Sequence, residues 1–292
     1  MLLASLAQLY EDNLFLSNLY EFLDLKRTVK EPAEPSPVPQ PMQRGIVVDH
    51  VSFQYPEGSR KVLEDISLNI NPGEVVALVG ENGSGKTTLI KLLCRLYDPT
   101  SGTITFDGMD LRQFETKALR REIAIIFQDY AHFHLTAREN IWFGNTDLAP
   151  DDERIMAAAR RAGADEVIRA LPQGYETILG KRFAAGEELS VGEWQKVALA
   201  RAFMRDAQII VLDEPTSSMD AKAEYEAFQN FHQLVRGRTA ILISHRFSTV
   251  RMADRIYVLE QGHVSESGSH DELLRQKGTY ARLFEMQAHH YR

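Results

Sequence analysis

The pattern of apolar and polar residues divides the chain into three parts, and the first part is helical. Within residues 1–25, Leu2, Leu9, Leu16 and Leu23 recur every seven residues, which predicts an amphipathic helix with an apolar seam. Because so short a helix is marginal on its own in water, we expect it to need an apolar partner.

The second part, residues 26–44, is dominated by proline. Five of the eleven prolines in the chain stand at positions 32, 35, 37, 39 and 41. Closely spaced prolines favour an extended polyproline conformation over a packed element. We therefore interpret residues 26–44 as a linker and place a domain boundary there.

The third part, residues 45–285, has the pattern of an α/β domain, with a short tail at 286–292. Apolar runs of strand length alternate with helical stretches, which is typical of a buried, mainly parallel sheet. The expected strands are Val75–Val79, Ile123–Phe127, Ile209–Leu212, Ala240–Ile243 and Arg255–Leu259. The expected helices are Lys86–Tyr97, Asp151–Ala162 and Glu193–Arg205, with one or two more over Asp271–His290.

A second, smaller sheet is expected from strict alternation of apolar and polar residues. The alternation covers Gly45–Tyr55, Ser67–Ile70 and Gly102–Phe106. Strands that are apolar on one face only are typical of an antiparallel sheet.

Composition and charge narrow the functional classes. The chain is 44% hydrophobic and 25% charged, as in ordinary soluble proteins. Its 41 acidic and 33 basic residues give a net charge of −8, which argues against a nucleic-acid partner. No apolar run approaches the roughly 20 residues that cross a bilayer, and the first residues lack the features of a secretory signal. The single cysteine, Cys94, allows neither a disulfide framework nor a zinc cluster.

One segment predicts a phosphate site. The strand Val75–Val79 leads into Gly80-Glu81-Asn82-Gly83-Ser84-Gly85-Lys86-Thr87, and a helical stretch follows. Glycines let consecutive backbone N–H groups curl around phosphate oxygens, and the helix N-terminus adds partial positive charge. In this G-x-x-x-x-G-K-[ST] pattern Lys86 reaches the β and γ phosphates and the Thr87 hydroxyl holds Mg²⁺. The predicted ATP contacts here are Asn82, Gly83, Ser84, Gly85, Lys86, Thr87 and Thr88.

Two adjacent carboxylates complete the predicted metal site. Asp213 and Glu214 end the apolar strand Ile209–Leu212, and ligands of open α/β sheets bind at the carboxyl ends of strands. Asp213 is placed to hold Mg²⁺, directly or through water, and Glu214 to polarise an attacking water.

With these motifs in place, residues 45–285 resemble the nucleotide-binding domain of an ATP-binding-cassette (ABC) transporter of the exporter type. Leu189-Ser190-Val191-Gly192-Glu193 is similar to the family's signature, Leu-Ser-Gly-Gly-Gln, from which Val191 and Glu193 depart. The stretch from Thr136 to Ile141 also resembles exporter domains. The implied fold is an α/β phosphate-loop ATPase core with a mainly parallel sheet, an antiparallel β subdomain and a helical subdomain at about 129–204.

The resemblance assigns further site residues. Tyr55 matches the aromatic residue that stacks on adenine, and Gln128 matches the Q-loop residue that contacts Mg²⁺ and water. Asp220 lies in the stretch that matches the D-loop, and His245 matches the switch histidine at the γ-phosphate. The implied catalytic residues are therefore Glu214 and His245, and the implied metal contacts are Thr87, Gln128 and Asp213.

The resemblance also implies partners. Two nucleotide-binding domains, identical or different, would enclose two ATP molecules head to tail, with Ser190, Gly192, Glu193 and Asp220 acting on ATP held by the other chain. The domain would work at the cytoplasmic face of a membrane against the transmembrane domain of an exporter, through about residues 129–165. Residues 1–25 resemble the cytoplasmic end of the last transmembrane helix, so we expect this chain to lack its membrane domain.

Two alternatives stay open. The chain could be a soluble ABC ATPase that acts on nucleic acid or ribosomes, although such proteins usually carry two cassettes or a long coiled-coil insertion. It could also be a weakly hydrolysing regulatory subunit, because Val191 and Glu193 depart from the signature. An ATPase assay of the chain beside its Glu214→Gln variant tests this second alternative. The Ser190–Glu193 spacing still predicts a capping box at the start of a helix.

Overall fold

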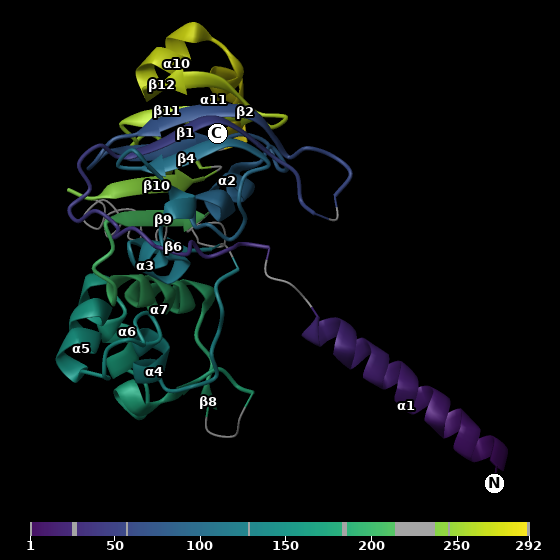
Figure 1. Cartoon of the computed structure of the whole chain (residues 1–292). Helices are drawn as coiled ribbons and strands as arrows, with labels where there is room; N and C mark the ends of the chain where they lie inside the picture. The colour runs from purple at the N-terminus through teal and green to yellow at the C-terminus, as the bar shows by residue number, and fades with distance from the viewer. Residues whose placement is uncertain are drawn as a thin grey trace. The chain divides into compact units, whose positions relative to one another are not determined.

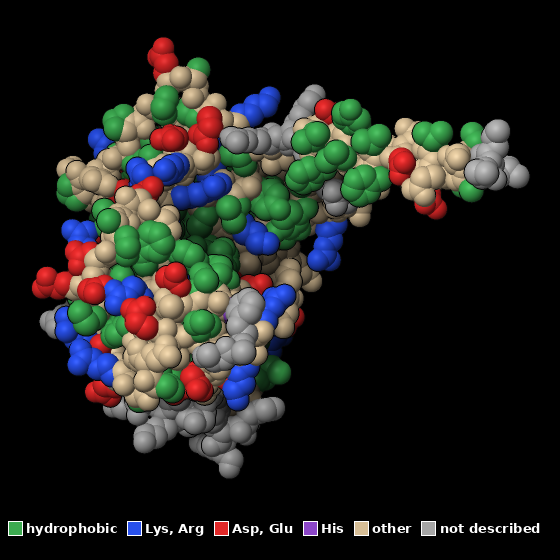
Figure 2. Space-filling view, turned by 90° about the horizontal axis from the view of Figure 1, so that it is seen from below, with side chains coloured by type: hydrophobic (Ala, Val, Ile, Leu, Met, Phe, Trp, Pro, Cys, Tyr) green, Lys and Arg blue, Asp and Glu red, His purple; other side chains and the backbone are tan. Residues whose placement is uncertain are grey.

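The computed structural model describes residues 2–24, 28–56, 58–127, 129–182, 186–213, 237–244 and 246–290. Contacts divide the chain into two units, Met1–Lys30 and Glu31–Arg292. The first unit consists mainly of the helix α1 (Leu2–Leu23), and Figure 2 shows hydrophobic side chains along its surface. Tyr10, Phe15 and Phe22 are exposed beside the leucines, so the apolar residues surround the helix and do not form a single seam. None of the described helices has the length and apolar character to span a bilayer.

The second unit is built around a six-stranded sheet. Its strand order is β12-β11-β3-β10-β9-β6, and all neighbours are parallel except the antiparallel pair β11 and β12. The strands are β3 (Val75–Val79), β6 (Ile123–Ile126), β9 (Ile209–Asp213), β10 (Thr239–Ile243), β11 (Arg255–Glu260) and β12 (His263–Gly268). Every residue of β3, β9 and β10 is buried, as expected for strands covered on both faces.

Alternate residues of these strands enter two different cores. Val75, Ala77 and Val79 pack with the helices of one core, whereas Val76 and Leu78 pack with the other. This alternation is the period of two that a pleated strand imposes.

The second core is closed by an antiparallel sheet of order β2-β1-β4-β5. Its strands are β1 (Ile46–Phe53), β2 (Leu63–Ile70), β4 (Ser101–Phe106) and β5 (Met109–Asp110). The predicted antiparallel subdomain is therefore confirmed. Next to it lie α2 (Lys86–Leu93), the 3-10 helix η1 (Leu111–Gln113) and α3 (Thr116–Arg121).

The first core contains a group of helices that Figure 1 shows beyond the β6 edge of the six-stranded sheet. They are α4 (Ala137–Trp142), α5 (Asp152–Arg161), α6 (Asp165–Arg169) and α7 (Val191–Phe203), with the 3-10 helix η2 (Gly174–Glu176). A short parallel pair, β7 (Ile178–Leu179) and β8 (Gly186–Glu187), precedes α7. Arg201 ties α7 to α4, because its guanidinium donates to the backbone oxygen of Asn140 at 2.8 Å and to Oδ1 of Asn140 at 2.6 Å.

The other helices that the structure describes are α9 (Phe247–Val250), α10 (His270–Gln276) and α11 (Thr279–His290). The predicted helix over Lys86–Tyr97 is shorter than expected. α2 ends where Arg95 takes a positive φ of 50°, and the amide of Leu96 bonds back to the carbonyl of Lys91. This 6→1 bond is the Schellman closure of a helix end.

The proline-rich segment is packed against the domain, which differs from the free linker that its composition suggests. Gln208 donates to Pro39 O at 3.0 Å and accepts from the amide of Met42 at 2.6 Å. The buried carboxylate of Glu122 accepts from the side chains of Gln40 and Gln208. The segment is therefore attached to Glu122 and Gln208. These residues directly precede β6, which starts at Ile123, and β9, which starts at Ile209.

Candidate functional site

The glycine-rich loop joins β3 to α2, as the sequence predicts. Gly80, Gly83 and Gly85 have φ values of 153°, 80° and 107°, which L side chains rarely adopt. A Cβ at Gly80 would lie 2.2 Å from the carbonyl oxygen of Leu259, and one at Gly85 would lie 2.4 Å from Cδ2 of Leu63. The loop therefore needs glycine at both positions, for conformation and for space.

Lys86, the first residue of α2, is folded onto this loop. Its Nζ donates to the carbonyl oxygens of Gly80 at 2.8 Å and Glu81 at 2.9 Å, and the residue is buried. A buried ammonium needs such acceptors, because burial without them is costly. The interactions hold the charge at the loop, where it can reach an anion that the loop encloses.

The next residue, Thr87, meets Asp213 at the end of β9. The Thr87 hydroxyl donates to Oδ2 of Asp213 at 3.2 Å, and Asp213 is buried. Sheet register makes this contact possible, since Ile243 of β10 pairs with Leu78 on one side and Asp213 on the other. A hydroxyl and a carboxylate are the hard oxygen donors that Mg²⁺ prefers, so the two residues fit a magnesium site.

Ser84 belongs to the same loop, and Thr88 lies in the first turn of α2. Ser84 is buried, and its Oγ has no hydrogen-bond partner within the described parts of the chain. Buried hydroxyls are usually satisfied, so this atom is available to an added ligand. Thr88 lies one turn along, and its Oγ1 is 3.1 Å from the hydroxyl of Tyr55.

Tyr55 thus lies beside the start of α2. Its ring is half-buried and packs edge-on against Phe53 and Tyr97, with centroids 4.9 and 5.2 Å apart. Lys91 Nζ is 5.7 Å from the centre of the ring. These contacts fix the ring next to the phosphate loop, which is where a base attached to a bound nucleotide would need a stacking surface.

The signature segment begins α7. Ser190 is its N-cap and forms a reciprocal capping box with Glu193, so the predicted helix start is confirmed. Behind it, Trp194 is buried, and the ring of His132 stacks on it with centroids 4.2 Å apart. Loss of hydration, followed in size by the nearby charge of Arg201, lowers the pKa of His132.

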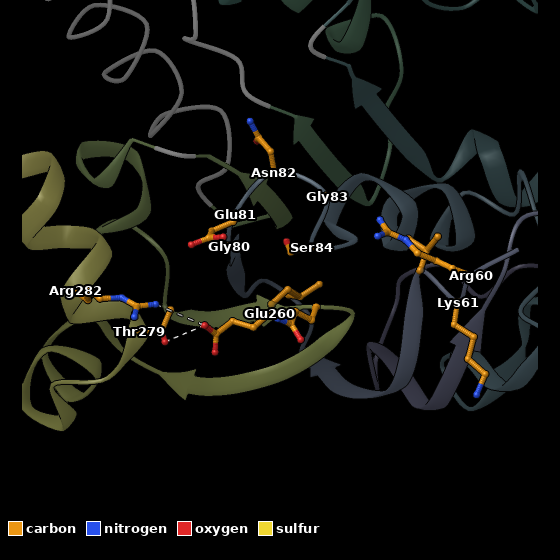
Figure 3. A pocket seen from close by; sticks show the side chains of 13 residues that line it. Arg60, Lys61, Gly80, Glu81, Asn82, Gly83, Ser84, Glu260, Thr279 and Arg282 are labelled. Atoms are coloured by element: carbon orange, nitrogen blue, oxygen red, sulfur yellow. Dashed lines mark hydrogen bonds and ion pairs between the residues drawn. The ribbon is translucent and has the colours of Figure 1, made fainter. Parts of the chain in front are cut away.

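A polar cavity of about 610 Å³ lies on the side of the loop that faces the end of β11 and the start of α11, and residues 60–62 also line it. Figure 3 shows residues 80–84 opposite Glu260, which accepts from the Thr279 hydroxyl at 3.0 Å and lies 4.0 Å from Arg282. None of the residues of this wall is among the predicted site residues. The positive φ values of Gln261 and Gly262 mark the hairpin turn that builds it, but no sequence pattern pairs Glu260 with α11.

Cys94, at the end of α2, takes no part in the site. Burial raises the pKa of its thiol to about 12, so the thiol stays protonated and packs as a small apolar group.

Four predicted site residues, Gln128, Glu214, Asp220 and His245, lie outside the described residues. Of the others, the structure brings the loop residues, Thr87, Thr88, Asp213 and Tyr55 together around the start of α2. Ser190, Gly192 and Glu193 lie separately, at the start of α7.

Comparison with known proteins gives a consistent result. Residues 63–217 match the family described as ABC transporter. The ATP-dependent lipid A-core flippase of Alkalilimnicola ehrlichii is 43% identical over 273 residues, which are 92% of this chain and 45% of the flippase. The putative multidrug export ATP-binding/permease protein YgaD of Bacillus subtilis is 41% identical over 243 residues, which are 83% of this chain and 41% of YgaD.

A solved structure has the same fold. The structure of a bacterial Atm1-family ABC exporter with ATP bound superposes with a TM-score of 0.85 at 35% identity, covering 96% of this chain and 48% of the exporter chain. This chain therefore spans less than half the length of the relatives that it matches.

Proposed function

Because this chain belongs to the ABC transporter family and contains its ATPase domain, we propose that it binds and hydrolyses ATP to drive an exporter. The observation that carries the proposal is the contact between Thr87 and Asp213 at the base of the phosphate loop. It joins a loop suited to phosphate to a buried carboxylate at the carboxyl end of β9. Ligands of open α/β sheets bind at the carboxyl ends of the strands.

We assign the phosphates of ATP to residues 82–88. Backbone N–H groups of the loop and the amino end of α2 would hold the phosphate oxygens. Lys86 would leave the carbonyl oxygens of Gly80 and Glu81 for the β and γ phosphates, which are stronger acceptors because they are charged. Tyr55 would stack on adenine.

We assign Mg²⁺ to Thr87, Asp213 and Gln128. When bound, the ion would neutralise charge that develops on the transferred phosphoryl group. The hydroxyl and carboxylate now bonded to each other would turn their oxygens to it.

The remaining chemistry falls to Glu214 and His245. Glu214 follows β9 directly, and we propose that its carboxylate orients the attacking water and accepts its proton. We propose that His245, two residues after β10, contacts the γ-phosphate and stabilises it as it leaves.

We further propose that ATP closes a head-to-tail dimer of two nucleotide-binding domains, with Ser190, Gly192 and Asp220 contacting ATP on the partner and Glu193 acting on it through Ser190. The separation of Ser190 from the phosphate loop, at the start of α7, supports a role in trans. Residues 129–165 would contact the transmembrane domain at the cytoplasmic face, and α1 would be the end of a membrane helix that enters the domain through residues 26–44. Its exposed apolar residues support this assignment.

The test is phosphate release by the wild type beside Glu214→Gln. We expect magnesium-dependent hydrolysis in the wild type and a loss of about 10²-fold or more in the variant, since a positioned base contributes about 10²–10⁴-fold. Equal and negligible rates in both would refute catalysis by this chain, and nucleotide affinity measured in parallel would show whether binding survives.

A further inference from the structure

The hydroxyl of Ser190 is occupied by a carboxylate of its own helix. Oε2 of Glu193 accepts from both the backbone amide and the Oγ of Ser190, each at 2.8 Å. The Ser190 Oγ accepts in return from the amide of Glu193, at 3.4 Å. The first turn of α7 is therefore closed on itself.

Among the described helices, the same motif starts two others. Thr136 pairs with Glu139 at α4, and Ser269 pairs with Glu272 at α10. In the second of these the amide of Ser269 donates to Oε2 of Glu272 at 2.8 Å, the same distance as at Ser190. The geometry at α7 is thus ordinary for a capping box, and what sets it apart is its position.

At α7 the motif competes with the role proposed for Ser190. A serine hydroxyl has one proton to donate, and here that proton points to Glu193. A γ-phosphate on the partner would need the same proton, and it would have to approach a second negative charge. Glu193 forms no ion pair with any Lys or Arg in the described ranges.

We propose that Glu193 restrains ATP-driven closure by holding the Ser190 hydroxyl, so that the dimer forms only at raised ATP concentrations. This inference rests on the proposed function, because it concerns the site that Ser190 completes in trans. Closure requires the bond between Ser190 Oγ and Glu193 Oε2 to break, and Glu193 is a positioning residue that acts through Ser190.

Glu193→Gln separates the effect of the negative charge from the formation of the helix start. A capping box accepts Glu or Gln, so Glu193→Gln keeps an acceptor for the amide of Ser190 and the length of the side chain. It removes the negative charge and the charge-assisted bond, which is about twice as strong as a neutral one. Glu272→Gln makes the same change in a capping box remote from the signature and serves as the matched control.

The experiment measures dimerisation by sedimentation velocity across a series of Mg-ATP concentrations, with Glu214→Gln present in every chain to block hydrolysis. We expect Glu193→Gln to lower the ATP concentration for half-maximal dimerisation by at least about threefold, because one charge-assisted bond no longer has to break. Glu272→Gln should leave that concentration unchanged. In a Ser190→Ala background the effect of Glu193→Gln should disappear, which a merely structural role would not predict.

The outcomes are distinct. If the chains dimerise with ATP but Glu193→Gln behaves like Glu272→Gln, or raises the concentration required, the restraint is refuted while the proposed function stands. If ATP produces no dimer in any variant, the proposed dimerisation fails and the restraint fails with it. Melting curves of both variants show whether α7 remains folded.

Discussion

The hydroxyl of Thr87 lies 3.2 Å from Oδ2 of Asp213, although 126 positions separate the two residues in the chain. The contact exists because β10 is in register with β3 on one side and β9 on the other. It places one oxygen donor from the phosphate loop and one from the strand end at the same point, which is the arrangement that an octahedral magnesium site needs.

Asp213→Asn should remove the magnesium dependence of ATP binding. We expect the gain in ATP affinity on adding Mg²⁺ to fall by at least about tenfold, since even outer-sphere partners of a metal contribute about 10–100-fold. Titration calorimetry with Mg²⁺ and with EDTA measures that gain. Asp206→Asn, a change at an exposed carboxylate paired with Arg238, is the control, and equal gains in both variants would count against the magnesium site.

Tyr55→Ala should weaken ATP binding by about 1–3 kcal/mol, the range for one base stacked on an aromatic ring. Tyr55→Phe keeps the ring and loses only the hydroxyl contact with Thr88, so its affinity should stay close to that of the wild type. Competition between GTP and ATP for each variant shows in addition whether residue 55 contacts the base. Equal losses in the two variants would show that the hydroxyl matters and the ring does not.

Glu122→Ala should loosen the proline-rich segment. It removes the acceptor that the carboxamides of Gln40, which is exposed, and Gln208, which is half-buried, share. The loss should be about 0.5–1.5 kcal/mol, the net contribution of an ordinary hydrogen bond. Urea unfolding measures the loss, and hydrogen exchange at the amide of Met42, which donates to Gln208, locates it. Glu34→Ala, at an exposed residue of the same segment, should change neither, and unchanged exchange at Met42 in Glu122→Ala would contradict the account.

The stability of the domain should fall in acid through His270. Burial, followed by the charge of Arg251, lowers the pKa of His270, whose Nδ1 lies 2.7 Å from the hydroxyl of Tyr280. The folded state therefore favours the neutral ring. Its contribution is complete above the ordinary pKa of about 6.5 and is lost as pH falls through the lower folded value.

His270→Gln removes this titration. The difference in unfolding free energy between wild type and variant should shrink as pH is lowered from about 7.5 to about 5, because only the wild type must take up the proton on unfolding. Urea unfolding at several pH values gives the difference. A difference that is constant with pH would show that His270 titrates alike in both states.

Much of the domain was predictable because its strands are buried on both faces. Near-continuous apolar runs such as Val75–Val79 are a strong signal, and the glycine pattern that follows specifies a loop for chemical reasons. The capping box at Ser190 was predictable too, since it depends on residues three apart. Each of these signals is local.

What escaped prediction depends on distant pairings. β12 alternates between exposed and half-buried residues at the edge of the sheet, so its pattern lacks a clear apolar face. The cavity wall at Glu260 requires α11 to meet the β11–β12 hairpin. The docking of the proline-rich segment rests on Gln208, which no local pattern marks. Its partners in that segment, Pro39 and Met42, are 169 and 166 positions away.

The central claim is that the phosphate loop and the signature act on one ATP from two different chains. Mixing two inactive variants tests it. Lys86→Ala removes the side chain proposed to contact the phosphates. Gly192→Asp adds bulk and negative charge to the signature, and an acidic residue in the first turn of α7 is compatible with the helix.

Each variant alone should be inactive, because both of its sites lack one part. In a mixed dimer one site joins Lys86 of one chain to Gly192 of the other. Random pairing of equal amounts makes about half of the dimers mixed, each with one intact site, so phosphate release should recover to about a quarter of the wild-type rate. A mixture no more active than its two components would contradict the shared site.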